Sequence, residues 1–286
     1  MGAFKTSPYR VKLFVIGVNK AGTSWLYYLL NEHPDIYMSE VKELYYFGNE
    51  YPNNLADYHK HFPFDESYSY YGEATPVYYR EEEIAEQIHK YSPAARLVAI
   101  IRDPVERTLS QFYFHKQLGI LREDTTFEDA INRQDPALVQ DSHYEESLSV
   151  YQKIFEDEQL KIVSLEAAKE SPKKFWKNLL NFLDLDHVAI SEQQSRSENV
   201  TGSPLFRKIY RGTIRPIKRR NPGLYNVLLK SSFMRWSKSV LLKVLGAAQK
   251  EDVRMRTKER LYREFEPTYT YLEEIGYGDV YHRSIE

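Results

Sequence analysis

The sequence predicts an α/β fold with a central, mainly parallel sheet and helices on both faces. The first observation is that short apolar strand patterns alternate with amphipathic helix patterns along the chain. The second is an apolar run near the start that leads through a glycine-containing loop into a helix. The third is the length, 286 residues, which is sufficient for a large core without disulfides. The chain has no cysteine, which excludes disulfides and thiolate metal sites.

Four segments have the pattern of strands. Each is a short apolar or alternating run that is bounded by turn residues. The strongest strand pattern is ARLVAII, residues 95–101. The predicted strands are residues 11–16, 67–73, 95–101 and 160–166.

Six segments have the pattern of helices. Stop signals such as His33-Pro34 and Gly119 follow two of them, and a third has acidic residues at its start and basic ones at its end. Ser142 and Glu145 have the spacing of a capping box. The predicted helices are residues 23–32, 81–91, 105–119, 142–156, 171–185 and about 251–275.

Three polar motifs follow predicted strands at the point where each strand ends. They are the loop that begins at Gly17, the carboxylate of Glu73 and the guanidinium of Arg102. The carboxyl ends of parallel strands meet at one edge of a sheet, and ligands of open α/β sheets bind beyond that edge. The sequence therefore predicts a ligand site there.

The loop GVNKAGTSWLYYLL has the composition of an anion site. A turn from strand to helix presents backbone N–H groups and the positive end of the helix dipole to an anion. Gly22 lets the backbone approach closely, Thr23 and Ser24 add hydroxyl donors, and Lys20 can reach a terminal oxyanion. Walker A would place a lysine directly after the second glycine, and no Walker B aspartate ends a predicted strand. A ligand with fewer charges than ATP, bound without a metal, is favoured.

Four motifs together resemble sulfotransferases that use 3′-phosphoadenosine-5′-phosphosulfate. NKAGTSWL resembles the K-x-G-T-[TS]-x-L loop of that family, and AIIRDPVERTLSQF resembles its R-x-P-x-x-R-x-x-S-x-[FY] signature. KELYYF and GEATPVYY resemble elements of the heparan-sulfate type, the N-deacetylase/N-sulfotransferase and 3-O-sulfotransferase-like branch, and of its bacterial relatives. The resemblance extends in order from residue 11 to about residue 190. It implies a P-loop-like three-layer sandwich that forms one domain over residues 1–286.

The resemblance implies how the nucleotide sulfate donor binds. Arg102 and Ser110 are expected to hold the 3′-phosphate, although an ion pair of Arg102 with a nearby acid and a solvent-facing Ser110 are the alternative. Trp25 is expected either to contact the adenine or to pack in the core. In NVTGSPLFRKIYRG, Leu205 stands where relatives have an arginine, so Arg207 and Arg211 are the candidates for a third contact. The loop residues expected to bind the donor are Lys20, Ala21, Gly22, Thr23 and Ser24.

Sulfuryl transfer needs a base for the acceptor and a cation for the leaving phosphate. Glu73 is the predicted base, because tyrosine-rich surroundings can desolvate it and raise its pKa; the alternative is a solvated turn glutamate. Lys20 is the predicted cation and Lys42 a second one, which Glu43 orients or simply pairs with.

His59 and His61 are the rival bases. The resemblance implies transfer to a hydroxyl or amine, with a carbohydrate as the expected acceptor and no metal requirement.

The charge distribution is uneven although the net charge is only −2. Residues 199–250 hold twelve Lys and Arg and no acid, whereas the rest of the chain carries all 41 acidic residues. This basic segment is a candidate lid or acceptor segment, and an anionic glycan, a membrane surface and a partner protein are its candidate ligands. A solvated basic face is the alternative. No nucleic-acid partner is expected.

Three further expectations concern location and function class. The first twelve residues lack a signal-peptide core and no 18-residue apolar run occurs. A cytoplasmic location is therefore expected, with an anchor outside this sequence left open. A P-loop kinase or ATPase is the enzymatic alternative, and a non-catalytic nucleotide- or glycan-binding protein is the other.

Overall fold

The computed structural model describes residues 10–65, 67–133, 136–190 and 253–281. The chain divides into two compact units, which are described separately here. The single domain expected over residues 1–286 stays a prediction. Among the described residues, the first unit comprises 10–65, 67–104, 141–190 and 265–281, and the second comprises 105–133, 136–140 and 253–264.

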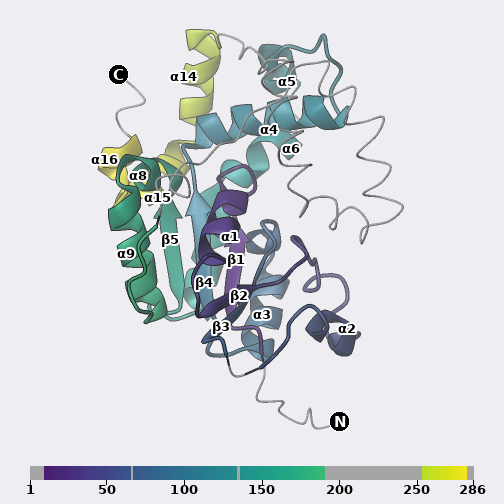
Figure 1. Cartoon of the computed structure of the whole chain (residues 1–286). Coiled ribbons are helices and arrows are strands. Elements are labelled where there is room, and N and C mark those ends of the chain that lie inside the picture. The colour runs from purple at the N-terminus through teal and green to yellow at the C-terminus, as the bar shows by residue number, and fades with distance from the viewer. Residues whose placement is uncertain (1–9, 66, 134–135, 191–252, 282–286) are drawn as a thin grey trace, which may run out of the picture. The chain divides into compact units, whose positions relative to one another are not determined.

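The first unit is built on a five-stranded sheet with the order β2-β3-β1-β4-β5 (Figure 1). Every pair of neighbouring strands is parallel, so the predicted central parallel sheet is confirmed. The strands are β1 (Leu13–Gly17), β2 (Ile36–Met38), β3 (Tyr70–Ala74), β4 (Arg96–Ile101) and β5 (Leu160–Ser164).

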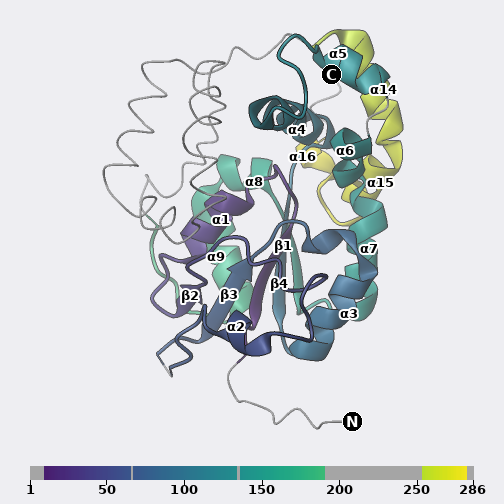
Figure 2. The same ribbon diagram turned by 90° about the vertical axis from the view of Figure 1, so that its right-hand side faces the viewer.

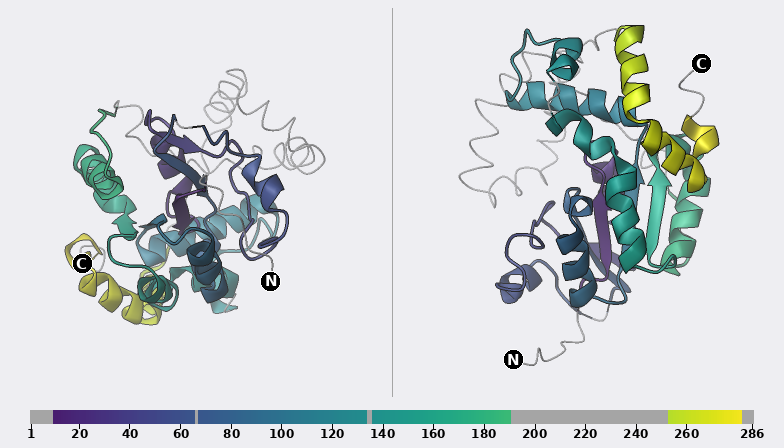
Figure 3. Two further views of the ribbon diagram at one scale, coloured as in Figure 1. Left: turned by 90° about the horizontal axis from the view of Figure 1, so that it is seen from below. Right: turned by 180° about the vertical axis from the view of Figure 1, so that it is seen from behind.

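Side chains of successive strand residues enter two different cores, one on each face of the sheet. Leu13 and Val15 of β1 pack with α1 (Thr23–Leu30) and α9 (Pro172–Leu183). Phe14 and Ile16 pack instead with α3 (Glu82–Tyr91) and α7 (Tyr144–Ile154). Figure 2 shows these two helix pairs on opposite sides of the strands, and the right view of Figure 3, seen from behind, shows α3 and α7 in front of the strands. The period of two along β1 therefore accounts for helices on both faces.

Shorter elements complete the two units. The first unit also contains α2 (Leu55–His59), the 3₁₀ turn η1 (Tyr78–Arg80), α8 (Leu165–Glu170), α15 (Glu266–Glu274) and α16 (Gly278–Tyr281). The 3₁₀ turn η2 (Gln140–Ser142) spans the boundary between the units in sequence. The second unit contains α5 (Phe127–Asn132), α6 (Pro136–Val139), α14 (Met255–Glu264) and, apart from its first residue, α4 (Pro104–Leu118).

The predicted capping box at Ser142 and Glu145 is wrong. Helix α7 begins one residue later than that box requires, with His143 at its N-cap and no side-chain cap. The Ser142 hydroxyl donates instead to the backbone carbonyl of Pro104 at 3.0 Å. A capping box does occur at α5, where Thr126 and Asp129 exchange side-chain and backbone hydrogen bonds.

Two predicted element boundaries also differ from the structure. The strand predicted for residues 160–166 ends at Ser164, because the Ser164 side chain accepts from the Ala167 N–H and starts α8. The helix predicted for about 251–275 is two helices, α14 and α15. Pro267 explains the break, since it lacks an N–H and is favoured only in the first turn of a helix, where it lies in α15.

The helices are short. The longest in the described part of the chain, α4, has 15 residues. None of the helices there combines the length with the apolar character that a bilayer crossing requires.

Candidate active site at the carboxyl edge of the sheet

The predicted meeting of the three motifs at one edge of the sheet is observed, and ligand binding there stays a prediction. Strands β3, β1 and β4 are direct neighbours. Their carboxyl ends carry Glu73, the loop after Gly17, and Arg102, in that order. Lys42 lies four residues beyond the end of β2, the strand next to β3. The sheet order therefore brings the carboxyl ends of three motif-bearing strands, which are distant in sequence, to one edge.

The loop between β1 and α1 ends at Gly22, which has a φ of 106° in the left-handed region that favours glycine. A side chain there would be strained and would also approach Leu165 to 3.0 Å. No side chain caps α1 at Gly22, and the N–H groups of a first helical turn have no partner within their own helix. Lys20 precedes this turn, half-buried and with a φ of 70°. The geometry is compatible with the predicted anion site.

The hydroxyl residues of the loop differ in exposure. Thr23 is buried, whereas Ser24 is exposed. Trp25 is half-buried and its ring packs against Phe175 of α9, with the centroids 5.3 Å apart. Packing of Trp25 on the domain is therefore observed, and its contact with adenine stays a prediction.

Lys42 and Glu43 form an ion pair with 3.0 Å between Nζ and Oε1. The Glu43 carboxylate also accepts from the Tyr45 hydroxyl. The two side chains keep 14% and 27% of their surface exposed, respectively. A carboxylate and an ammonium group near the edge strand are thus both accessible to solvent.

Glu73 is completely buried, so the alternative of a solvated turn glutamate is wrong. Tyr58 donates to its Oε1 at 2.7 Å and Thr75 donates to its Oε2 at 2.9 Å. The Tyr78 hydroxyl lies 3.4 and 3.5 Å from the two oxygens. We call these four residues, Glu73, Tyr58, Thr75 and Tyr78, the Glu73 cluster.

Burial raises the pKa of Glu73 to about 7, although the three hydroxyl donors act in the opposite direction. The prediction that tyrosine-rich surroundings desolvate this carboxyl group is therefore confirmed. Burial also raises the pKa of Tyr58 and of Tyr78 well above the usual range. Both tyrosines consequently remain donors at neutral pH.

The rival histidines lie at the end of α2 and just after it. His59 Nε2 is 2.8 Å from the Tyr91 hydroxyl, and its ring meets Phe64 edge-on at 5.0 Å. Burial lowers the pKa of both His59 and His61. Neutral imidazoles are therefore expected at physiological pH, which would suit a base as well as a structural contact.

Arg102 lies directly after β4 and has an acidic neighbour. Its Nε is 3.9 Å from Glu166 Oε1 of α8, and its backbone carbonyl accepts from the Tyr144 hydroxyl at 2.7 Å. The predicted alternative of an ion pair is thus observed at the limit of contact distance, and 17% of the Arg102 side chain remains exposed. A role in 3′-phosphate binding stays a prediction.

The remaining predicted nucleotide contacts are not all described. Ser110 is half-buried on α4, in the second unit. Its convergence with Arg102 stays a prediction. Arg207, Arg211 and the whole basic segment 199–250 lie outside the described residues.

Sequence reasoning missed the three hydroxyls around Glu73. Thr75 and Tyr78 belong to the motif GEATPVYY, so their proximity in sequence was a usable signal. Tyr58 lies on α2, fifteen residues before Glu73. Nothing in its local pattern distinguishes it from the other 23 tyrosines of the chain.

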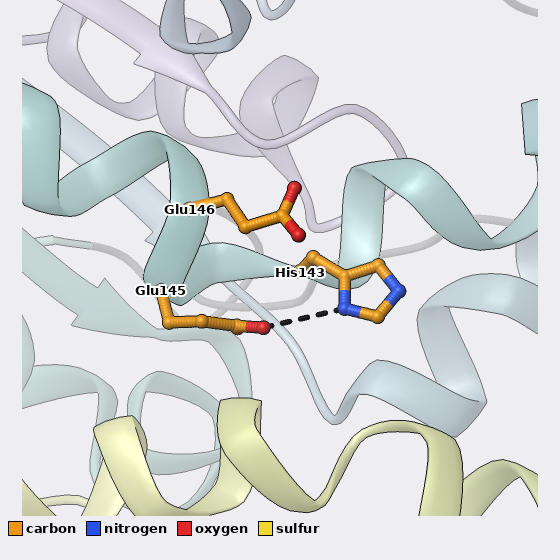
Figure 4. Close-up of side chains that lie close together, drawn as sticks. All are labelled: His143, Glu145 and Glu146. Atoms are coloured by element: carbon orange, nitrogen blue, oxygen red, sulfur yellow. Dashed lines mark hydrogen bonds and ion pairs between the residues drawn. The ribbon is translucent and has the colours of Figure 1, made fainter.

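A group of metal-ligating residue types also escaped prediction. His143, Glu145 and Glu146 have ligand atoms within 4.8 Å of one another (Figure 4). His143 Nδ1 lies 3.3 Å from Glu145 Oε1, and Glu145 also accepts from Thr268 at 2.6 Å. Acids in the first turn of a helix are stabilised by its dipole without any cation. The helix dipole and these two contacts account for the proximity of His143, Glu145 and Glu146.

Comparisons with known proteins bear on the family and the fold of this chain. Residues 10–220 match the sulfotransferase domain. The chain belongs to the sulfotransferase domain family. Its fold is similar to the crystal structure of a sulfotransferase from Alicyclobacillus acidocaldarius, with a TM-score of 0.57, 22% identity, and coverage of 76% of this chain and 96% of that one. The predicted P-loop-like three-layer α/β fold is thereby confirmed.

Two relatives of known name match this chain over only part of their own length. Membrane-associated sulfotransferase kil1 of Dictyostelium discoideum is 25% identical to this chain in an alignment that covers 75% of this chain and 64% of that protein. Human heparan sulfate glucosamine 3-O-sulfotransferase 5 is 33% identical over 103 residues, which cover 35% of this chain and 30% of that protein. This sulfotransferase-family chain thus spans less than two thirds of either relative.

The raised pKa of Glu73 predicts a pH dependence of stability. Between about pH 4.5 and about pH 7 the folded chain holds a proton on Glu73 that the unfolded chain releases. The free energy of unfolding should therefore fall as the pH rises through this window, by up to about 1.4 kcal/mol per pH unit. Glu73→Gln should remove this contribution.

Urea unfolding of the wild type and of Glu73→Gln at pH 5, 6, 7 and 8 measures the effect. The exposed Glu86 provides the matched control Glu86→Gln, which should follow the wild-type curve. Parallel curves for the wild type and Glu73→Gln would show that Glu73 has an ordinary pKa.

Proposed function

We propose that this chain transfers a sulfuryl group from 3′-phosphoadenosine-5′-phosphosulfate to a hydroxyl or amine of an acceptor. The observation that carries the proposal is the loop from Gly17 to Ser24, at the carboxyl end of β1 and at an uncapped helix N-terminus, in a chain that matches the sulfotransferase domain. The uncapped N–H groups and Lys20 form a donor set suited to a phosphosulfate. The nucleotide that donates the sulfuryl group is a co-substrate, and the proposed reaction requires no metal.

The donor is proposed to bind by its two ends. Its 5′ end lies against Lys20 and the backbone of residues 21–24, and its 3′-phosphate is bound by Arg102 and Ser110. The forked donors of an arginine suit a phosphate. Trp25 is proposed to contact the adenine. Arg207 and Arg211, outside the described residues, are the candidates for a third contact.

The transfer itself is a single in-line displacement. The acceptor oxygen or nitrogen forms a bond to sulfur while the bond between sulfur and the 5′-phosphate oxygen breaks. The acceptor proton passes to a carboxylate base. The leaving group is adenosine 3′,5′-bisphosphate, and Lys20 stabilises the negative charge that develops on it. Lys42 is proposed as a second cation beside the transferred group.

Glu73 is the proposed base, because a pKa of about 7 suits a group that must accept a proton near neutral pH. Its complete burial favours a second candidate, however. Glu43 keeps 27% of its side chain exposed and is paired with Lys42, so an acceptor can reach it without a rearrangement. The two carboxylates are distinguished by the experiment below.

The proposed acceptor is a carbohydrate. The support comes from the relatives named heparan sulfate glucosamine 3-O-sulfotransferases, which match over about a third of this chain. The basic segment 199–250 is proposed to bind an anionic part of the acceptor, with an anionic surface as the alternative. A cytoplasmic location stays a prediction.

Two other functions remain as alternatives to be tested. A P-loop kinase or ATPase would require magnesium and turn over ATP. A non-catalytic binding protein would bind the nucleotide or a glycan without transfer. The presence of Lys20, Lys42, Glu43 and Glu73 at one edge favours catalysis over binding alone.

The first prediction concerns nucleotide selectivity. Adenosine 3′,5′-bisphosphate should raise the melting temperature far more than AMP or ATP, because it occupies both anion sites. At about 100 times its Kd, a ligand adds about 2.7 kcal/mol to the free energy of unfolding. Differential scanning fluorimetry measures the shift, and chelation of divalent metals should leave it unchanged. Arg102→Ala should reduce it, whereas equal stabilisation by ATP with magnesium would contradict the proposal.

The second prediction concerns the base. Glu73→Gln should lower turnover by about 10²–10⁴-fold, the range for loss of a general base, while the Kd of the bisphosphate nucleotide stays nearly constant. Glu43→Gln is the matched variant. Turnover is measured as transfer of labelled sulfate to a panel of glycans, lipids and small alcohols. If Glu43→Gln alone abolishes turnover, the base is Glu43, and if His59→Ala or His61→Ala does so, neither carboxylate is the base.

A further inference from the structure

The segment Leu44–Phe47, which follows the Lys42–Glu43 pair, is held by side-chain hydroxyls. The Leu44 N–H donates to Thr75 Oγ1 at 3.2 Å. The N–H groups of Tyr46 and Phe47 both donate to the Tyr78 hydroxyl, at 2.8 and 3.3 Å. The segment belongs to no helix or strand, so hydroxyls rather than a backbone ladder accept from these three N–H groups. On its carbonyl side, Tyr46 accepts from the N–H groups of Glu50 and Tyr51 at 3.0 and 3.1 Å.

The same two hydroxyls direct their protons to Glu73. Thr75 Oγ1 is 2.9 Å from Glu73 Oε2, and the Tyr78 hydroxyl is 3.4 Å from the same oxygen. A hydroxyl has a single proton to donate. Because the lone pairs of Thr75 and Tyr78 receive backbone N–H groups, their protons are available for the carboxylate. Each hydroxyl therefore links one end of the segment to Glu73.

A third hydroxyl connects Glu73 to the same segment through a ring contact. Tyr58 donates to Glu73 Oε1 at 2.7 Å. Its ring stacks on Tyr46, with centroids 4.2 Å apart and planes inclined by 11°. Tyr58, Tyr46 and Glu73 are all buried. Three independent routes thus lead from one carboxylate to residues 44–47.

We propose that Glu73 is a positioning residue that holds Leu44–Phe47 through Thr75, Tyr78 and Tyr58, and thereby fixes the Lys42–Glu43 pair at the carboxyl edge of the sheet. The inference rests on the proposed function only for the statement that Lys42 and Glu43 act on the reacting groups. It applies whether the acceptor proton goes to Glu73 or to Glu43.

The proposal has a consequence for pH. A protonated Glu73 becomes a donor itself, so one of the three contacts must reverse its direction and the proton of that hydroxyl must turn away from the carboxyl group. The titratable groups that face Glu73 are Tyr58 from α2, Tyr78 from η1 and Tyr91 from α3. Tyr91 in turn contacts His59, at 2.8 Å, and the Arg10 guanidinium, 5.7 Å from its ring centroid. Segment 44–47 should accordingly loosen as the pH falls below the pKa of Glu73.

Hydrogen exchange of the full chain, read by mass spectrometry, tests the proposal directly. Thr75→Val removes one link and leaves the Glu73 carboxylate in place. It should speed exchange of the amides at 44–47 by about tenfold, the effect of losing roughly one hydrogen bond, whereas Thr75→Ser should restore the wild-type rate. Glu73→Gln should speed it at least as much. Thr268→Val, which removes a buried hydroxyl bonded to Glu145 instead, should have no effect there.

Peptides from β1 and α9 serve as internal controls for folding, since their exchange should not change. If Glu73→Gln fails to fold, the Thr75→Val and Thr75→Ser pair still decides the question. Unchanged exchange at 44–47 in a folded Thr75→Val variant would overturn the proposal.

Kinetics separates positioning from a merely structural role. Thr75→Val should lower kcat about tenfold and move the acid limb of the pH profile, with the Kd of adenosine 3′,5′-bisphosphate unchanged, and Thr75→Ser should recover both. A chain without any sulfotransfer would contradict the proposed function, while the exchange result would still decide the positioning role. Sulfotransfer with unaltered exchange at 44–47 would contradict the positioning role alone.

Discussion

The buried carboxylate of Glu73 is the constraint on which the candidate site depends. A carboxylate in a protein interior is tolerated only when hydrogen bonds compensate for lost hydration. Here the compensation comes from Tyr58 of α2 and from Thr75 and Tyr78, which follow Glu73 closely in the sequence. Because two of these hydroxyls also receive backbone N–H groups of residues 44–47, satisfying one charge organises an irregular segment. The cost of burial remains visible in the pKa, which lies at about 7.

The sheet order decides what surrounds this carboxylate. Placing β1 between β3 and β4 sets the loop at Gly17 beside the end of the strand that carries Glu73 and beside the end of the strand that precedes Arg102. Parallel pairing is necessary for this arrangement, because an antiparallel neighbour would send its carboxyl end to the opposite edge. The glycine-containing loop, Arg102 and a carboxylate of raised pKa thus meet at one edge through topology alone. The same edge is where open α/β sheets bind ligands in general.

Much of this fold could be predicted from the sequence, for identifiable reasons. Strands β1 and β4 are continuous apolar runs because both of their faces are covered by helices, and such runs stand out. Strand β2 has only three residues, Ile36–Met38, which are too few to produce a periodic pattern. The break at Pro267 was missed because residues before it, such as Lys258, Glu259 and Leu261, have good helix propensity. The proline itself lies in the first turn of α15, where it starts a helix.

The candidate site was predicted only in part. Positions at strand ends, such as Glu73 and Arg102, follow from element order. Their partners, Tyr58 and Glu166, come from segments that are remote in sequence and are set by tertiary packing. Sequence reasoning also assumed that a raised pKa and access to substrate go together. In Glu73 the same burial that raises the pKa encloses the group, whereas Glu43 keeps 27% of its side chain exposed.

The most direct test of this account is an infrared titration of Glu73. The spectrum of Glu73→Gln is subtracted from that of the wild type between pH 5 and pH 9, which isolates the carbonyl stretch of one protonated carboxyl group. The account predicts that this band is present at pH 5 and disappears with a midpoint near pH 7. A midpoint below pH 5, or no band at any pH in this range, would mean that Glu73 is an ordinary carboxylate and would contradict the account.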